Sequence, residues 1–200
     1  MLKKKTALLV LLLLLLPGLC AASPVTDRLA KVGSDLDASA RGSMALKILC
    51  KKELVPLCTL PALIDAAKVS NAKQTSLEAI KKLDQEWIDA EEPLEIMDEL
   101  QNNACGKALQ SFAAKNHLIA KGFVFDNQGA TVGSHSIPND YWQGDEGKYR
   151  KTVQDKSIEI GPVKFDKAEN RQLQHVALPL IDTDGTVVGG VLIGIFIDKL

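Results

Sequence analysis

Apolar positions recur every three or four residues over the first half of the chain. Leu29, Val32 and Leu36 follow this spacing, which places them on one face of a helix. The stretch 76–90, SLEAIKKLDQEWIDA, repeats the pattern, begins with a serine that can cap a helix, and carries a tryptophan on its apolar face. Strand-like alternation is rare across residues 23–115. We therefore expect this region to be helical.

After residue 116 the pattern changes to short apolar runs separated by turn residues. The segment 123–132, FVFDNQGATV, indicates a strand, a glycine-containing turn and a second strand. The segment 176–197, VALPLIDTDGTVVGGVLIGIFI, repeats this arrangement, and its apolar final run predicts a central strand covered on both faces. A further strand is expected over 158–165, divided by a Gly-Pro pair. The whole predicts an α+β fold, with a long N-terminal helical region packed on an antiparallel sheet of about five strands.

The N-terminus has the pattern of a secretory signal peptide. Lys3, Lys4 and Lys5 precede an apolar run over residues 7–16, and a patch of small residues follows. The apolar run is short for a membrane span. We predict a signal peptide over residues 1–22, cleaved after Ala22, with an uncleaved anchor as the alternative. The protein is then exported to the periplasm or secreted, and residues 23–200 form a single domain.

Composition is that of an ordinary globular protein, with 46% hydrophobic and 24% charged residues. Removal of the three N-terminal lysines leaves 21 basic and 25 acidic side chains, a net charge of −4. This mildly acidic balance argues against a nucleic-acid partner. Cys50, Cys58 and Cys105 remain after cleavage. Export permits one disulfide among them, and three buried thiols are the alternative.

No catalytic, metal or cofactor motif stands out in the sequence. It contains no Gly-x-Ser-x-Gly, no Cys-x-x-Cys and no phosphate-binding glycine loop. The segment 182–185, DTDG, begins like a calcium loop, but residue 193 is isoleucine where an acidic ligand is needed, so a hairpin turn is the better interpretation. The three histidines lack the spacing of metal ligands. We therefore expect neither an enzyme nor a bound cofactor or metal.

One polar segment concentrates aromatic residues. Residues 140–151, DYWQGDEGKYRK, hold both tyrosines of the chain and one of its two tryptophans, although aromatic residues make up only 4% of the sequence. Such rings can form the flat wall of a binding pocket. They can equally anchor a long loop on the sheet without touching a ligand.

The order of these segments resembles the extracytoplasmic Cache or PDC sensor domains of bacteria. The resemblance spans the mature chain and is strongest over residues 122–198, where the DYWQGDEGKY loop and the DTDGTVVGG hairpin occur together. It implies a PAS-like sheet over residues 116–200 that follows the helical lead-in, 23–115. It further implies that the N-terminal helix lies on one sheet face, and that a long connection between the second and third strands covers a small-ligand pocket on the other.

This resemblance directs attention to six candidate ligand-binding residues. Lysines can receive a carboxylate, and a strand histidine facing the pocket can donate to it. The acidic candidate can hold an amine or instead cap a short helix from residue 146. The histidine can also be hydrogen-bonded locally without a ligand. The candidates are Tyr141, Trp142, Asp145, Lys148, Lys164 and His175.

The expected function is a periplasmic sensor domain that binds a small metabolite, with an organic acid as the preferred class. The chain ends at Leu200 without a second apolar span, so we expect a membrane-bound signalling protein to read its occupancy. The alternative is a protein-interaction module that uses the helical half and has no small-molecule ligand. The apolar stripe of the first helix can form a homodimer or pack on its own sheet. An enzyme on the same frame is the third hypothesis.

Overall fold

The computed structural model describes residues 23–200, and the predicted signal peptide lies outside them. Helices occupy most of the chain before residue 116, and the sheet follows. The helical elements are α1 (Pro24–Ala38), α2 (Met44–Leu49), η1 (Cys50–Leu54), η2 (Val55–Thr59), α3 (Pro61–Lys73), α4 (Leu77–Asp89), α5 (Glu95–Asn102), α6 (Ala104–Lys115), α7 (Gly147–Tyr149), η3 (Arg150–Gln154) and η4 (Ile197–Lys199). The strands are β1 (Ile119–Asp126), β2 (Thr131–Ser134), β3 (Glu159–Asp166), β4 (Arg171–Ile181) and β5 (Val187–Phe196).

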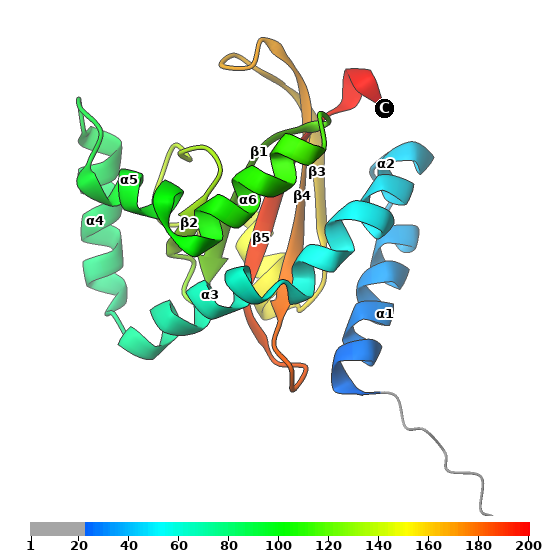
Figure 1. Cartoon of the computed structure of the whole chain (residues 1–200), viewed down its shortest axis with the longest axis horizontal. Coiled ribbons are helices and arrows are strands. Elements are labelled where there is room, and N and C mark those ends of the chain that lie inside the picture. Colours follow the sequence, from blue (N-terminus) through cyan, green and yellow to red (C-terminus); the bar gives the residue numbers. More distant parts are fainter. Residues whose placement is uncertain (1–22) are drawn as a thin grey trace, which may run out of the picture.

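The five strands form one antiparallel sheet in the order β2-β1-β5-β4-β3 (Figure 1). The predicted α+β class and the expected number of strands are therefore confirmed. The apolar last strand, β5, is central and pairs with β1 and β4, as its composition predicted. Both predicted hairpin turns are present, with Gly129 and Gly185 at positive φ of 89° and 84°. Strand β3 lies at one edge and carries a bulge between Ile160 and Val163, where the Gly-Pro pair occurs.

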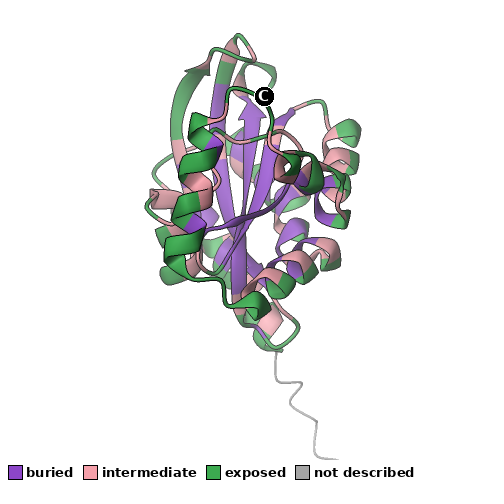
Figure 2. Cartoon of the chain, turned by 90° about the vertical axis from the view of Figure 1, so that its left-hand side faces the viewer, coloured by how far each residue is buried: buried purple, intermediate pink, exposed green. Residues whose placement is uncertain are grey.

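One face of the sheet is covered by helices. Val191, Ile193 and Ile195 of β5 project into this layer, where they join one large apolar cluster. The predicted stripe of the first helix packs here too, because Val32 and Leu36 are fully buried. Figure 2 shows the buried sheet between helices whose outer surfaces are exposed. The helical elements that contribute buried residues to this cluster are α1, α2, η1, η2, α3 and α6.

The opposite face is covered by the connection between β2 and β3, residues 135–158. Tyr149 and Val153 of this connection pack on Phe123, Phe125 and Leu192 from the sheet. Phe125 is fully buried. Its ring fits over Gly190 of the central strand, where an added Cβ would lie 2.5 Å from the ring. The two covered faces are the arrangement that the resemblance to Cache and PDC domains implied.

The aromatic segment of the connection anchors helix α4 to the rest of the fold. The carboxylate of Asp84 on α4 accepts two hydrogen bonds, each 2.8 Å long, from the backbone N–H groups of Tyr141 and Trp142. Trp87 of the same helix lies 5.7 Å from the Tyr141 ring, centroid to centroid, and donates to the carbonyl of Pro138 at 3.1 Å. Trp87 is therefore a packing residue, as its position in the helical pattern predicted.

Loss of the Asp84 carboxylate should loosen this attachment. In Asp84→Ala two backbone N–H donors lose their acceptor, and we expect the free energy of unfolding to fall by about 2 kcal/mol. Denaturant unfolding followed by circular dichroism measures the change. Glu86→Ala is the matched control, because this exposed carboxylate on the same helix makes only a 3.8 Å ion pair with Lys82. Equal stability of the two variants would contradict the anchoring role.

The three described cysteines are free thiols buried in the helical layer. Burial raises the pKa of Cys50, Cys58 and Cys105 to about 12 in each case. The alternative of three buried thiols is therefore the one observed. Because the thiolate is the reactive species, these groups should be inert in the folded protein.

Thiol titration of residues 23–200 tests this state. We expect no reaction of the native protein with a disulfide reagent within minutes, and three reactive thiols per chain after unfolding in denaturant without reductant. Fewer than three thiols in the unfolded sample would indicate a disulfide.

Candidate ligand-binding site

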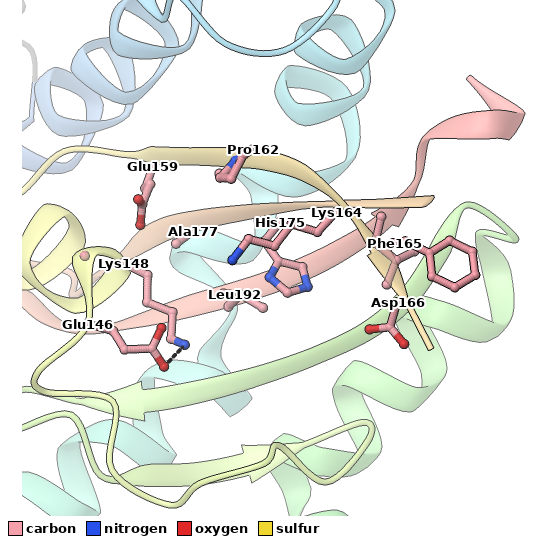
Figure 3. A pocket seen from close by; sticks show the side chains of 13 residues that line it. Glu146, Lys148, Glu159, Pro162, Lys164, Phe165, Asp166, His175, Ala177 and Leu192 are labelled. Carbon is pink, nitrogen blue, oxygen red and sulfur yellow. Dashed lines mark ion pairs between the residues drawn. The ribbon is translucent and has the colours of Figure 1, made fainter. Parts of the chain in front are cut away.

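A cavity of about 240 Å³ lies between the sheet and the covering connection (Figure 3). Its floor is formed by β4 and β5, one wall by β3, and the other by the start of the helical turn at residues 146–148. Figure 3 shows the side chain of Lys164 extending into the cavity and the ring of Phe165 pointing away from it. The residues around it are Glu146, Gly147, Lys148, Glu159, Gly161, Pro162, Lys164, Phe165, Asp166, Leu173, His175, Ala177 and Leu192.

Strand alternation places the floor residues. Leu173, His175 and Ala177 are spaced by two on β4, so they share the cavity face, whereas Val176 and Leu178 between and beyond them join the helix-side core. The space above His175 depends on Gly194 of β5. A Cβ at that position would lie 2.7 Å from Cγ of Lys121 and 3.3 Å from the His175 ring. The glycine therefore lets both side chains lie flat over the central strand.

The bulge in β3 determines which of its residues face the cavity. Lys164 is opposite Leu173 in the ladder, and directly opposed residues project to the same face. Val163 and Phe165 are opposite Gln174 and Gln172, so they project to the other face, where both are exposed. A shift of the ladder by one residue would have removed the lysine from the cavity.

Most of the charged side chains around the cavity are paired with one another in two ion pairs. Lys148 pairs with Glu146 at 2.6 Å, and its ammonium lies 5.3 Å from the centroid of the Phe123 ring. Lys121 of β1 spans the face of the sheet to reach Asp166 of β3 at 2.5 Å. The Lys121 ion pair and the hydrogen bonds from the Glu169 and Ala168 backbone hold the pKa of the Asp166 carboxyl below its usual value. Both pairs are therefore internally neutral.

Lys164 and Glu159 carry the remaining charges. Within residues 23–200 neither side chain forms an ion pair with another residue. The carboxylate of Glu159 lies against Gly147, where an added Cβ would approach Oε1 to 3.2 Å. One positive and one negative group are thus available to a molecule in the cavity.

His175 lies at the floor of the cavity, where its surroundings favour the neutral imidazole. Burial lowers the pKa of its imidazole, and the neighbouring charges of Lys121 and Lys148 lower this pKa further. A neutral imidazole can donate one hydrogen bond and accept another. It therefore adds polar recognition without adding charge.

The structure brings three of the six predicted site residues together and leaves three elsewhere. Lys148, Lys164 and His175 surround this cavity. Tyr141 lines a different cavity on the helix-covered face. Trp142 packs against the β1–β2 turn, donating from Nε1 to the carbonyl of Gln128 at 2.8 Å.

Asp145 is exposed, and its predicted capping role is wrong. The N-cap of the short helix is Glu146, and no side chain caps it. The reason is that the chain stays extended for one residue longer, with φ and ψ of −91° and 157° at Glu146. This shift turns the side chain of Glu146 rather than that of Asp145 to the cavity.

Sequence reasoning missed Glu159, Asp166 and Lys121. Glu159 lies before the bulge and Asp166 after it, so a simple alternation along β3 could not assign both to one face. Lys121 lies on β1 and pairs with Asp166 of β3, and strands β5 and β4 lie between them in the sheet. This contact can be predicted only when the order of the strands is known. The sequence held one indication of the cavity itself. Gly194 interrupts the apolar run of the last strand, and a glycine at such a position leaves space above the sheet.

Comparison with known proteins gives similarity in structure only. No protein-family model matches the chain, and no curated protein matches it. The sensor domain of the histidine kinase DctB from V. cholerae is similar, with 15% identity and a TM-score of 0.43 over 85% of this chain and 56% of that one. The ligand-binding domain of the Campylobacter jejuni chemoreceptor Tlp3, in complex with L-valine, has 13% identity and a TM-score of 0.38 over 69% of this chain and 58% of that one.

A third similar structure is the ligand-binding domain of the Pseudomonas aeruginosa amino acid chemoreceptor PctC in complex with GABA. It has 12% identity and a TM-score of 0.36, over 67% of this chain and 57% of that one. The chain spans less than two thirds of the length of each of these three structures. All three are sensor or ligand-binding domains, the class that the sequence resembles.

Residues 23–200 contain no group of three or more His, Cys, Asp or Glu side chains placed to hold a metal ion. Across residues 23–200, no helix is both long enough and apolar enough to cross a membrane.

The neutral His175 predicts a dependence of stability on pH. As pH falls through the ordinary histidine value of 6.5, the unfolded chain takes up a proton before the folded protein does, since the folded pKa is lowered. Stability should therefore fall between about pH 7.5 and about pH 5.5. Denaturant midpoints at both values measure this fall, which should be smaller in His175→Gln. The pKa of His135 is also lowered by burial, so His135 accounts for part of the fall in stability that remains in His175→Gln. An unchanged fall in His175→Gln would contradict the assignment.

Proposed function

We propose that this protein is an exported sensor-type binding protein whose ligand is a small metabolite with a carboxylate group. The ligand occupies the cavity between the sheet and the connection 135–158. The observation that carries this proposal is the ammonium group of Lys164, which extends into the cavity and forms no ion pair with the described residues. A lysine in such a position provides a charge-assisted hydrogen bond to a carboxylate.

The other groups around the cavity narrow the ligand class. His175 can donate a second hydrogen bond to the carboxylate, and Glu159 can accept from an ammonium group. Leu173 and Leu192 provide apolar contact for a short side chain. A cavity of about 240 Å³ limits the ligand to a few carbon atoms. These features favour an amino acid over a simple dicarboxylate.

Ligand binding in this position would join two parts of the fold. Lys164 and Glu159 belong to β3, whereas Lys148 belongs to the connection that covers the sheet. A bound molecule that contacts both would hold the edge strand against the connection. In our proposal a membrane-bound signalling protein reads this change. Residues 23–200 act as one domain after removal of the signal peptide, residues 1–22.

Thermal shifts against a panel of small molecules test the proposal. The probes are succinate, L-valine, L-isoleucine, 4-aminobutyrate and the corresponding amines without a carboxylate. A ligand at a hundred times its Kd adds about 2.7 kcal/mol to stability, which gives a clear shift. We expect a carboxylate-bearing probe to bind and Lys164→Ala to weaken it about tenfold in calorimetric titration.

Lys167→Ala is the matched control. It removes the same charge three residues away, in the exposed turn after β3 and outside the cavity. This variant should bind as the wild type does. Equal weakening by both substitutions would show that only overall charge matters. No shift with any probe would favour the alternative, a protein-interaction module built on the helical half.

A further inference from the structure

A second and larger cavity lies on the helix-covered face of the sheet. Its volume is about 460 Å³, within the range of sites that hold small molecules. Helices α3 and α5 each pack against α6 and β2, and the cavity lies between them. Tyr141, from the aromatic segment, closes part of it. The sheet separates this cavity from the one that contains Lys164.

Small and aliphatic side chains create the space. The helices present alanines where larger residues would fill the gap between them. Ala62 and Ala66 come from α3, and Ala104 from the first turn of α6. The remaining apolar surface comes from Val69, Ile96, Leu100 and Val132. A ligand here would therefore have a substantial apolar body.

The charged groups around this cavity are mainly acidic. Asp65, Lys73 and Glu99 line it, and none of them forms an ion pair with any residue in the described part of the chain. Asp65 and Lys73 are eight residues apart on α3, so about 12 Å separates their positions along the helix axis. Lys73 is the last residue of α3 and lies about two turns of helix beyond Asp65.

The chain that leads into α5 is also rich in acidic residues. Between residues 84 and 99 there are eight carboxylates, and no lysine or arginine occurs from residue 83 to residue 106. This segment includes all of α5, which forms one wall of the cavity. Like charges concentrated beside a low-dielectric wall attract counter-ions of opposite sign.

Tyr141 supplies an aromatic surface of the kind that attracts cations. Its ring is fixed by Trp87, whose centroid is 5.7 Å away, and by the two backbone hydrogen bonds to Asp84. No hydrogen bond involves its hydroxyl group within residues 23–200. A cation near such a ring gains from the quadrupole of the aromatic face.

We propose that this cavity is a second binding site, specific for a small organic cation with a hydrophobic body. The apolar groups of α3, α5 and β2 hold the body of the ligand, and Asp65, Glu99 and Tyr141 attract its charge. The site shares no residue with the cavity that holds Lys164, so it does not depend on the function proposed for that cavity.

Titration of the purified protein with 2-phenylethylamine, a cation at neutral pH, tests the site. Its partner probe is 3-phenylpropionate, which has a similar shape and the opposite charge. We expect the amine to bind at least about tenfold more tightly and to change the emission of Trp87, whose ring packs at a tilt against Tyr141. Equal affinity for the two probes would overturn the proposal.

Variants locate the binding. Asp65→Asn and Glu99→Gln should each lower the affinity for the amine about threefold, and the double variant should lower it about tenfold. The single effects are modest because these carboxylates are partly screened by solvent. Glu95→Gln is the matched control, since this exposed carboxylate lies on α5 outside the cavity. Unchanged affinity in the double variant, or an equal loss in the control, would overturn the assignment.

A space-filling substitution gives an independent test. Ala104 is exposed at the start of α6, so Ala104→Leu should fill the cavity while the protein still folds, as its melting curve would verify. We expect this variant to lose amine binding and Lys164→Ala to keep it. Retention of full affinity in folded Ala104→Leu would place the amine elsewhere and contradict the proposal.

Discussion

The double-sided burial of strand β5 is the constraint on which the rest of the structure depends. Val191, Ile193 and Ile195 pack against the helical layer, and Leu192 faces the connection between β2 and β3. On that second side, glycine replaces a large side chain at Gly190 and Gly194. These gaps admit the ring of Phe125 and the side chains that surround the first cavity. A single strand thus anchors one layer and leaves space for a site in the other.

The connection 135–158 stays in place because its aromatic residues are used for attachment. Tyr141 and Trp142 bind Asp84 through their backbones, and Tyr149 donates to the carbonyl of Asn127 at 2.8 Å while it packs on Phe125. These contacts join a peripheral helix, a turn of the sheet and the covering segment. The same anchoring brings Lys148 to the first cavity and Tyr141 to the second. One short segment therefore attaches the connection to the fold and lines both cavities.

The sheet separates two cavities of different chemistry. The first is small and balanced in charge, with Lys164 and Glu159 available to a ligand. The second is larger, more apolar and acidic, with Asp65 and Glu99 at its edge. The two cavities share no lining residue, and the sheet lies between them. In our proposals they take two classes of molecule, which for this reason would not compete directly.

The sequence alone determined the helical first half, the two glycine-containing hairpins and the central place of the last strand. Each of these follows from local periodicity, turn chemistry or an uninterrupted apolar run. It also pointed to Lys148, Lys164 and His175, which the fold brings to one cavity. Tertiary structure alone decided that Tyr141 lies on the opposite face and that the cysteines remain free. The physical reason is that these outcomes depend on contacts between residues far apart in the sequence. Such contacts set the bulge in β3, the order of the strands and the attachment of the connection to Asp84, and no local sequence pattern encodes which residues they join.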